Sequence, residues 1–307
     1  MSRIYLKLTG GLGNQLFQFA IAKEISEVTK ETICLFYVDR IGDDDFLFHA
    51  REAFMIISKL CDATDFIESK KFSNFSKFDR LKLKFLYNFS LSGKRVHLMV
   101  QDNPFAGGIK NSILDFLVIQ KKRRVIIEGY FQKPEEFESG FLSTISMLST
   151  LIDKNCFEEE YMISSAGKRT IGETVIHVRR GDYMNETWIK NFGVLSDEYY
   201  VDICEELTNP TSTILITELK GDVYSITDRF KAITCLDTQD LNTLQSFSLM
   251  SKAKYVFVSN STFSFWAAHV AMYRGGEAIF PTPWNKSGDR MQILFTTGKS
   301  RDAIFVD

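Results

Sequence analysis

The sequence predicts an α/β protein with two domains, each built on a parallel sheet. Three observations support this prediction. Short apolar segments of strand length alternate with segments of helical period through the second half of the chain. The first 39 residues already follow a strand, helix, strand order, which favours parallel pairing. A chain of 307 residues is long enough for two domains of ordinary size.

The first half begins with regular elements and then becomes less clear. Apolar runs and a glycine turn define its start, and residues 40–120 give weaker patterns, with a helix expected around 76–88. Pro134, followed by two glutamates, is expected to open a helix, because proline suits the first turn and acids suit the helix dipole. The remaining expected elements are strands at 4–8, 33–39 and 124–131 and a helix at 14–29.

The second half alternates more regularly. Ser196 is expected to cap a helix over 196–207, which the Asn209-Pro210 pair ends. The expected strands are 174–179, 213–217, 232–236, 255–259 and 277–280, and the further helices are 222–230, 240–253 and 263–273. A polar, glycine-containing stretch at 155–172 suggests domains of residues 1–160 and 161–307. In such doubly wound sheets, ligands bind at the carboxyl ends of the strands.

Composition excludes several classes of function. A net charge of -2 argues against broad nucleic-acid binding, and the sequence lacks 18 consecutive apolar residues, so no membrane-spanning helix is expected. The five cysteines form no CxxC pair and are interpreted as reduced thiols of a cytoplasmic protein, which also shows no targeting segment. The basic, aromatic stretch 71–87 could make peripheral membrane contact, although a core role is the simpler interpretation.

A glycine-rich turn, TGGLGNQ, joins the first strand to the first helix. Gly11 and Gly13 would let a ligand approach the backbone, and the helix start offers N–H groups to an anion. No Gly-Lys-Ser/Thr follows, so the turn is not a P-loop. It matches a dinucleotide fingerprint imperfectly, since Leu16 replaces the third glycine, while Asp39 could serve as a ribose-binding acid. A tight structural turn is an equally good interpretation.

The segment IHVRRGDY places two cations at the end of an apolar strand. Arg179 and Arg180 could bind phosphate oxygens, although strand alternation favours only one of them in direct contact. Asp182 could orient that arginine, and His177 lies on the same strand face as Arg179. The alternative is a pair of surface arginines bonded to carboxylates.

A third motif, SNSTFSFW, follows the strand at 255–259. Ser259, Asn260, Ser261 and Thr262 stand between a strand and a helix, where hydroxyl and N–H groups could bind an anion. Phe265 and Trp266 could line a sugar site. The alternative interpretation is helix capping followed by an apolar core stripe.

Together these motifs resemble the bacterial α-1,2-fucosyltransferases of glycosyltransferase family 11. The resemblance rests on GGLGNQLFQ, EGYFQKPEEF, HVRRGDY and LMSKAKYVFVSNSTFSFWAAHV in that order, and it covers about residues 3 to 285. It implies a GT-B-like fold of two facing Rossmann-like domains with a cleft between them. It also implies inverting, metal-independent transfer of L-fucose from GDP-β-L-fucose to the 2-hydroxyl of a terminal β-galactoside.

The resemblance also assigns roles to residues. Arg179 and Arg180 would hold the donor diphosphate, with Arg179 essential, and the loop Ser259–Thr262 would lie at the phosphates or the fucose. Gly11, Gly13 and Asn14 would line the cleft from the N-terminal domain, which is expected on the acceptor side. Tyr183, Phe265 and Trp266 are the acceptor candidates.

Some positions depart from the family pattern. Glu218 is followed by Leu219 where an acidic pair is common, Ser246 stands where an acid is common, and Phe265 precedes Trp266 where two tryptophans are usual. These departures put the acceptor in question more than the donor.

The general base is left open among Asp182, Glu186 and His177, with a preference for Asp182. No cofactor or metal is expected, and GDDDF at 42–46 is interpreted as a solvated turn. The expected partners are GDP-fucose and a β-galactoside-terminated glycan or lipid-linked oligosaccharide of a surface polysaccharide or O-antigen, at the inner membrane face. Alternatives are another fucosyl linkage, a non-catalytic binding protein, or an NAD-dependent oxidoreductase that uses Gly11, Gly13 and Asp39.

Overall fold

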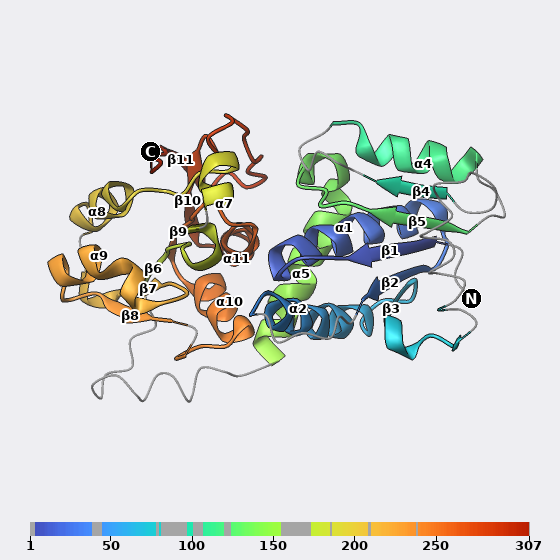
Figure 1. The fold of residues 1–307 in the computed structure, drawn as a ribbon, viewed down its shortest axis with the longest axis horizontal. Coiled ribbons are helices and arrows are strands. Elements are labelled where there is room, and N and C mark those ends of the chain that lie inside the picture. Colours follow the sequence, from blue (N-terminus) through green and yellow to red (C-terminus); the bar gives the residue numbers. More distant parts are fainter. Residues whose placement is uncertain are drawn as a thin grey trace. The chain divides into compact units, whose positions relative to one another are not determined.

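The computed structural model places two compact units along the chain, Met1–Met147 and Leu148–Asp307. The predicted boundary near residue 160 falls within 155–172, outside the described residues. The structure describes residues 4–38, 45–77, 80, 97–100, 107–119, 124–154, 173–184, 186–207, 210–237 and 239–306 (Figure 1).

Unit 1 is built on a parallel sheet with strand order β3-β2-β1-β5-β4. Its strands are β1 (Ile4–Leu8), β2 (Ile33–Tyr37), β3 (Ile67–Lys71), β4 (His97–Val100) and β5 (Val125–Glu128). Its helices are α1 (Leu12–Thr29), α2 (Asp45–Cys61), η1 (Phe72–Asn74), α4 (Ile109–Ile119), η3 (Pro134–Phe137) and α5 (Glu138–Lys154), and α5 continues into unit 2. The predicted strands at the start of this unit and the helix opened by Pro134 are confirmed.

The apolar runs of β1, β2 and β5 explain why these three strands form the middle of the sheet. Every residue of β2 is buried, as expected for a strand covered on both faces. By contrast, β3 has the sequence IESKK and is mostly exposed or half-buried at the sheet edge. The sequence interpretation missed β3, α2, β4 and α4. Most of the helix expected at 76–88 lies outside the described residues.

Helices α1 and α5 of unit 1 approach closely at Gly140. The Glu24 carboxylate accepts a hydrogen bond from the Gly140 N–H at 2.9 Å and so caps the start of α5. A Cβ at position 140 would lie 2.2 Å from the carbonyl oxygen of Ala20 and 2.9 Å from the Glu24 nitrogen. Both neighbours are backbone atoms of α1, which cannot move aside without shifting the helix.

We therefore expect Gly140→Ala to destabilise unit 1, although alanine has the higher helix propensity. The overpacking should cost about 1–3 kcal/mol, more than the roughly 1 kcal/mol that the propensity change contributes. Urea unfolding of Gly140→Ala against the wild type measures the difference. Gly107→Ala is a control in the same unit for the added methyl group, because its nearest contacts are at 3.4 Å or more and belong to side-chain ends. A stabilised Gly140→Ala protein would contradict the close approach.

Unit 2 contains a parallel sheet with strand order β11-β10-β9-β6-β7-β8. The strands are β6 (Thr174–His177), β7 (Thr213–Ile216), β8 (Thr234–Leu236), β9 (Tyr255–Phe257), β10 (Glu277–Thr282) and β11 (Gly298–Asp302). The helices are η4 (Gly181–Met184), α7 (Glu186–Asn191), α8 (Asp197–Glu205), η5 (Pro210–Ser212), η6 (Lys220–Val223), α9 (Tyr224–Arg229), α10 (Thr243–Lys252) and α11 (Thr262–Tyr273). Apart from β11, every strand of this sheet was predicted, and the doubly wound arrangement is confirmed.

The two faces of this second sheet carry different helices. Ile176 of β6 packs in one core cluster with Tyr199 and Tyr200 of α8 and with Ile226 of α9. On β10, Phe280 contacts Phe265 of α11, with ring centroids 5.8 Å apart. Because neighbouring residues of a strand point to opposite faces, Val178 and Arg180 extend the α8 face beyond β6, and His177 and Arg179 extend the opposite face.

Capping determines where α8 begins. The Ser196 hydroxyl accepts a hydrogen bond from the Tyr199 N–H, as predicted from the sequence. In the part of the chain that the structure describes, none of the helices combines the length and apolar character needed to cross a bilayer.

Candidate functional site

The candidate site of unit 2 lies where the strand order reverses. From β6 the chain proceeds outward through β7 and β8, and it then returns to the other side of β6 to form β9, β10 and β11. The chain therefore leaves the carboxyl ends of β6 and β9 in opposite directions along the sheet. Such a pair of strand ends is a topological switch point, which is the usual place for a ligand in these sheets. Residues 178–183 follow β6, which ends at His177, and residues 258–262 follow β9, so both predicted motifs meet at the carboxyl ends of these two strands.

The guanidinium of Arg179 lies at these strand ends and is partly exposed. Its side chain is 25% exposed, its Nη1 donates to Oε1 of Glu218, and its guanidinium lies 4.7 Å from the ring centroid of Tyr183. Glu218 follows β7, the strand next to β6. The cation is thus held by a carboxylate at one corner and by an aromatic ring on one face.

The Glu218 carboxylate is ionised and holds two groups. Its Oε2 accepts a hydrogen bond from the Arg180 N–H at 2.9 Å. Burial works toward a higher pKa for Glu218, but the Arg179 cation and the Arg180 N–H outweigh burial, and the pKa of this carboxyl is lowered. A carboxylate that binds both the side chain of residue 179 and the backbone of residue 180 fixes the turn after β6.

Arg180 has a structural role, and this corrects the prediction that it contacts the donor. Its guanidinium is buried, donates to the Leu195 carbonyl at 2.6 Å and to Asp197 Oδ1 at 2.7 Å, and lies over the Tyr200 ring. Strand alternation is the reason, because it directs Arg180 toward α8 and Arg179 to the other face. Asp197 is the half-exposed partner that sequence analysis did not identify.

His177 is buried and neutral. Its Nδ1 lies 2.7 Å from the Ser259 hydroxyl, and this hydrogen bond joins the ends of β6 and β9 at the switch point. Burial lowers the pKa of His177 to about 4, with the Arg179 cation working in the same direction. A base with this pKa that is also bonded to Ser259 is poorly placed to take a proton from a ligand, so the structure argues against His177 as the general base.

The loop Ser259–Thr262 is held by its own side chains. Ser259 also bonds Ser264 Oγ at 3.2 Å, and Asn260 Nδ2 donates to the Gly193 carbonyl at 2.9 Å. Both side chains are buried, so their predicted direct contact with the donor is corrected to a role in shaping the loop. Ser261 precedes α11 without a side-chain cap, and Thr262 is partly exposed as its first residue.

Phe265 and Trp266 do not line an acceptor site. Both side chains are completely buried, and Phe265 packs against His269, Phe280 and Trp284. Phe265 lies one turn after the start of α11, where it packs on Phe280 of β10. The core stripe of the alternative interpretation is confirmed for Phe265 and Trp266, whereas the helix capping that it also expected is not found, because Ser261 makes no side-chain cap bond.

In unit 1, the glycine turn follows the carboxyl end of β1. Gly10 has a left-handed φ of 76°, and Gly11 has open space where a Cβ would stand. Gln18, completely buried, donates to the Thr9 hydroxyl and to the Gly129 carbonyl, and so joins the ends of β1 and β5. The strand order reverses between these two strands as well.

At the start of α1, there is open space beside Gly11, whereas the residues that follow are buried or half-buried. Gly13 is buried, and Asn14 is partly buried and accepts from Gln132 Nε2 at 3.0 Å. Leu16, which replaces the third glycine of a dinucleotide fingerprint, is completely buried in α1. Asp39, the acid of that alternative, lies outside the described residues.

The two carboxylate candidates for the base lie just after the arginines. Asp182 belongs to η4, and its side chain is outside the described part of the structure. Glu186 begins α7 and is exposed. Among the side chains that the structure describes, no group of three or more His, Cys, Asp or Glu is arranged to hold a metal ion, and the side chains of GDDDF, residues 42–46, are not among them.

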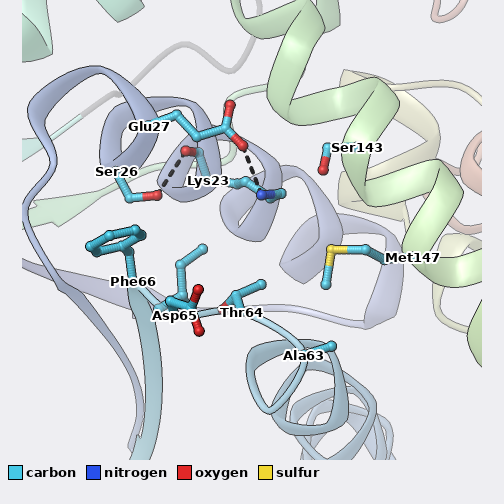
Figure 2. A pocket seen from close by; sticks show the side chains of 10 residues that line it. Lys23, Ser26, Glu27, Ala63, Thr64, Asp65, Phe66, Ser143 and Met147 are labelled. Carbon is cyan, nitrogen blue, oxygen red and sulfur yellow. Dashed lines mark hydrogen bonds and ion pairs between the residues drawn. The ribbon is translucent and has the colours of Figure 1, made fainter.

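A separate hollow of about 410 Å³ lies in unit 1 (Figure 2). Phe66 and Ile67 line it at the amino end of β3, so it is at the opposite end of the sheet from the glycine turn. Its cation, Lys23, pairs with Glu27 at 2.7 Å. None of the residues predicted for the site lines this hollow.

Glu218 is the main site residue that sequence analysis did not assign, although a signal existed. β6 and β7 are parallel with His177 opposite Ile216. Arg179 and Glu218 each stand two residues beyond this pair, so opposite charges leave neighbouring strands in register. The residues that follow neighbouring strands, compared with one another, would have predicted that Arg179 and Glu218 lie side by side.

Comparison with known proteins agrees with this arrangement of motifs. The family model described as glycosyl transferase family 11 matches residues 3–292. The chain is 28% identical to an alpha-1,2-colitosyltransferase of Escherichia coli over 295 residues, 92% of this chain and 93% of the relative. It is 22% identical to the O-antigen biosynthesis glycosyltransferase WbnK of Escherichia coli over 302 residues, 94% and 97% of the two chains.

Matches among solved structures include a glycosyl transferase family 9 protein from Veillonella parvula, with a TM-score of 0.48, 8% identity and coverage of 98% and 86% of the two chains. The fucosyltransferase NodZ from Bradyrhizobium has a TM-score of 0.48 and 14% identity, with coverage of 88% and 93%. Because the family model spans almost the whole chain, this protein belongs to glycosyltransferase family 11 and is a glycosyltransferase.

Proposed function

We propose that this protein transfers L-fucose from GDP-β-L-fucose to the 2-hydroxyl of a terminal β-galactoside, with inversion, in the synthesis of an O-antigen or other surface polysaccharide. The observation that carries the proposal is the partly exposed Arg179 guanidinium at the switch point of a doubly wound sheet in a family 11 chain. The α-1,2 linkage and the O-antigen role in the names of two relatives support it.

The chemistry needs charge stabilisation above all. In a single displacement, the acceptor oxygen forms its bond to the anomeric carbon while the bond from that carbon to the diphosphate breaks, and negative charge grows on GDP. Arg179 would stabilise that charge, and the N–H groups at the start of α11 would add to it. Because both are fixed before the reaction, no reorganisation is needed when the charge develops.

A base must accept the proton of the acceptor hydroxyl. With His177 buried and bonded to Ser259, we propose Asp182 for this role and Glu186 as the alternative. The acceptor side would include Tyr183, whose ring already lies against Arg179. Donor contacts are also proposed for Gly11, Gly13 and Asn14 of unit 1, and neither metal nor cofactor would take part.

A second donor deserves a direct test because a relative at 28% identity is a colitosyltransferase. Colitose lacks the 3-hydroxyl that fucose carries, so a site built to bond that hydroxyl would reject colitose, whereas an apolar site would favour it. Competing GDP-fucose and GDP-colitose in one reaction measures the preference as a ratio of kcat/KM values.

The test of the proposed function is transfer from GDP-fucose to β-galactosides in EDTA, with product linkage determined by NMR. We expect an α-1,2-linked product and no product from the matched 2-deoxygalactoside. Transfer to the 2-deoxygalactoside would indicate another linkage. Binding of NAD without binding of GDP would overturn the glycosyltransferase donor site altogether and favour the oxidoreductase alternative.

A further inference from the structure

A carboxylate stands directly beside the cation that the proposed reaction uses. Glu218 leaves β7 in register with Arg179 leaving β6, and its Oε1 accepts from Arg179 Nη1. The second oxygen, Oε2, accepts from the backbone N–H of Arg180 at 2.9 Å. One side chain therefore ties the arginine fork to the backbone turn that carries it.

The geometry around this carboxylate leaves little freedom. The Glu218 side chain is 18% exposed, less than that of Arg179 at 25%. A Cβ on Gly181 would stand 3.4 Å from both Cβ and Cγ of Glu218, and Gly181 has a left-handed φ of 58°. The turn after Arg180 is thus packed against the glutamate stem, which fixes where the carboxylate can lie.

We infer that Glu218 is a positioning residue, which acts through Arg179 and orients its guanidinium toward the leaving diphosphate. An arginine carries five N–H donors in a rigid planar fork, so a carboxylate at one corner sets the direction of the whole fork. The Tyr183 ring limits rotation from the flat side. The inference rests on the proposed function, because it takes the anion bound by Arg179 to be a nucleoside diphosphate.

This role has an unusual consequence. Glu218 helps anion binding only while Arg179 stands beside it, because its own negative charge repels a diphosphate. Removal of the Glu218 carboxylate should therefore weaken diphosphate binding in the wild type and strengthen it in the Arg179→Ala background. A residue that merely supports the fold would weaken binding in both backgrounds.

The experiment is calorimetric binding of GDP, in EDTA, to the wild type, Glu218→Ala, Arg179→Ala and the double variant. We expect Glu218→Ala to weaken GDP binding by about tenfold in the wild type and to strengthen it by about tenfold in the Arg179→Ala background. Steady-state transfer by Glu218→Ala should show a larger loss in kcat than rise in KM, because the fork is needed most in the transition state. Glu218→Gln, which keeps the size and one acceptor oxygen, should recover part of the loss.

Two controls separate the possible failures. Glu206→Gln removes an exposed carboxylate paired with Arg301 in the same unit and should leave GDP binding unchanged. If the wild type does not bind GDP, the proposed function fails. If it binds GDP and Arg179→Ala weakens binding, but Glu218→Ala weakens it equally in both backgrounds, only the positioning role is overturned.

Discussion

Replacing Arg179 with alanine is expected to lower the rate of sugar transfer by about 10²–10³-fold. Arg179 is the cation at the reversal of strand order that is both partly exposed and held in direction, by Glu218 and by Tyr183. Removal of a fixed donor costs most in the transition state, where charge on the leaving group is greatest. The measurement is kcat and kcat/KM with GDP-fucose and a β-galactoside.

Two further substitutions make this test specific. Arg179→Lys keeps the charge but loses the planar fork, so an intermediate rate is expected. Arg180→Ala removes the neighbouring arginine, which is buried and bonded to Leu195 and Asp197. Its main effect should be on stability, a loss of about 2–3 kcal/mol from unsatisfied partners, and not on chemistry in the folded fraction.

Arg179→Ala also leaves Glu218 as a half-buried carboxylate without its cation, which itself destabilises the turn. The double variant Arg179→Ala with Glu218→Gln removes that complication, and it should be folded and still inactive. Normal turnover by a folded Arg179→Ala protein would exclude Arg179 from the mechanism.

The two adjacent arginines illustrate how far the sequence alone could predict the site. Strand alternation correctly indicated that the two side chains leave the strand on opposite faces, Arg179 toward Glu218 and Arg180 toward Asp197. It could not indicate that the other is bound by Asp197, because that contact depends on where α8 packs. Glu218 was visible as a departure from a family pattern, and its contact with Arg179 became clear only from the pairing of β6 with β7.

The fold was predictable where burial imposes a pattern. Central strands such as β2 must be apolar on both faces, and the sequence shows it. The edge strands β3 and β11, with sequences IESKK and GKSRD, are largely exposed and so carry no apolar run. Phe265 and Trp266 were assigned to a sugar site but are buried in the core. In a sequence, an aromatic run after a loop looks the same whether it packs in the core or lines a sugar site.

Acidification is expected to destabilise unit 2 through two buried histidines. His269 is fully buried, its Nδ1 lies 2.8 Å from the Phe265 carbonyl, and its ring packs on Phe265. Burial lowers the pKa of His269 to about 4, as it does for His177. An unfolded histidine takes up its proton near pH 6.5, so below that pH the unfolded chain binds more protons than the folded one.

The stability that these residues contribute is fully present above about pH 6.5 and is lost as the pH falls toward 4, by about 3 kcal/mol for each histidine. Urea unfolding between pH 7.5 and 4.5 measures the slope. His269→Gln, which has a donor and an acceptor but no charge in this range, should reduce the slope, and Lys231→Gln, an exposed control in the same unit, should not. An NMR titration in which His177 and His269 both protonate near pH 6.5 in the folded protein would contradict the conclusion that both side chains are buried in the neutral form.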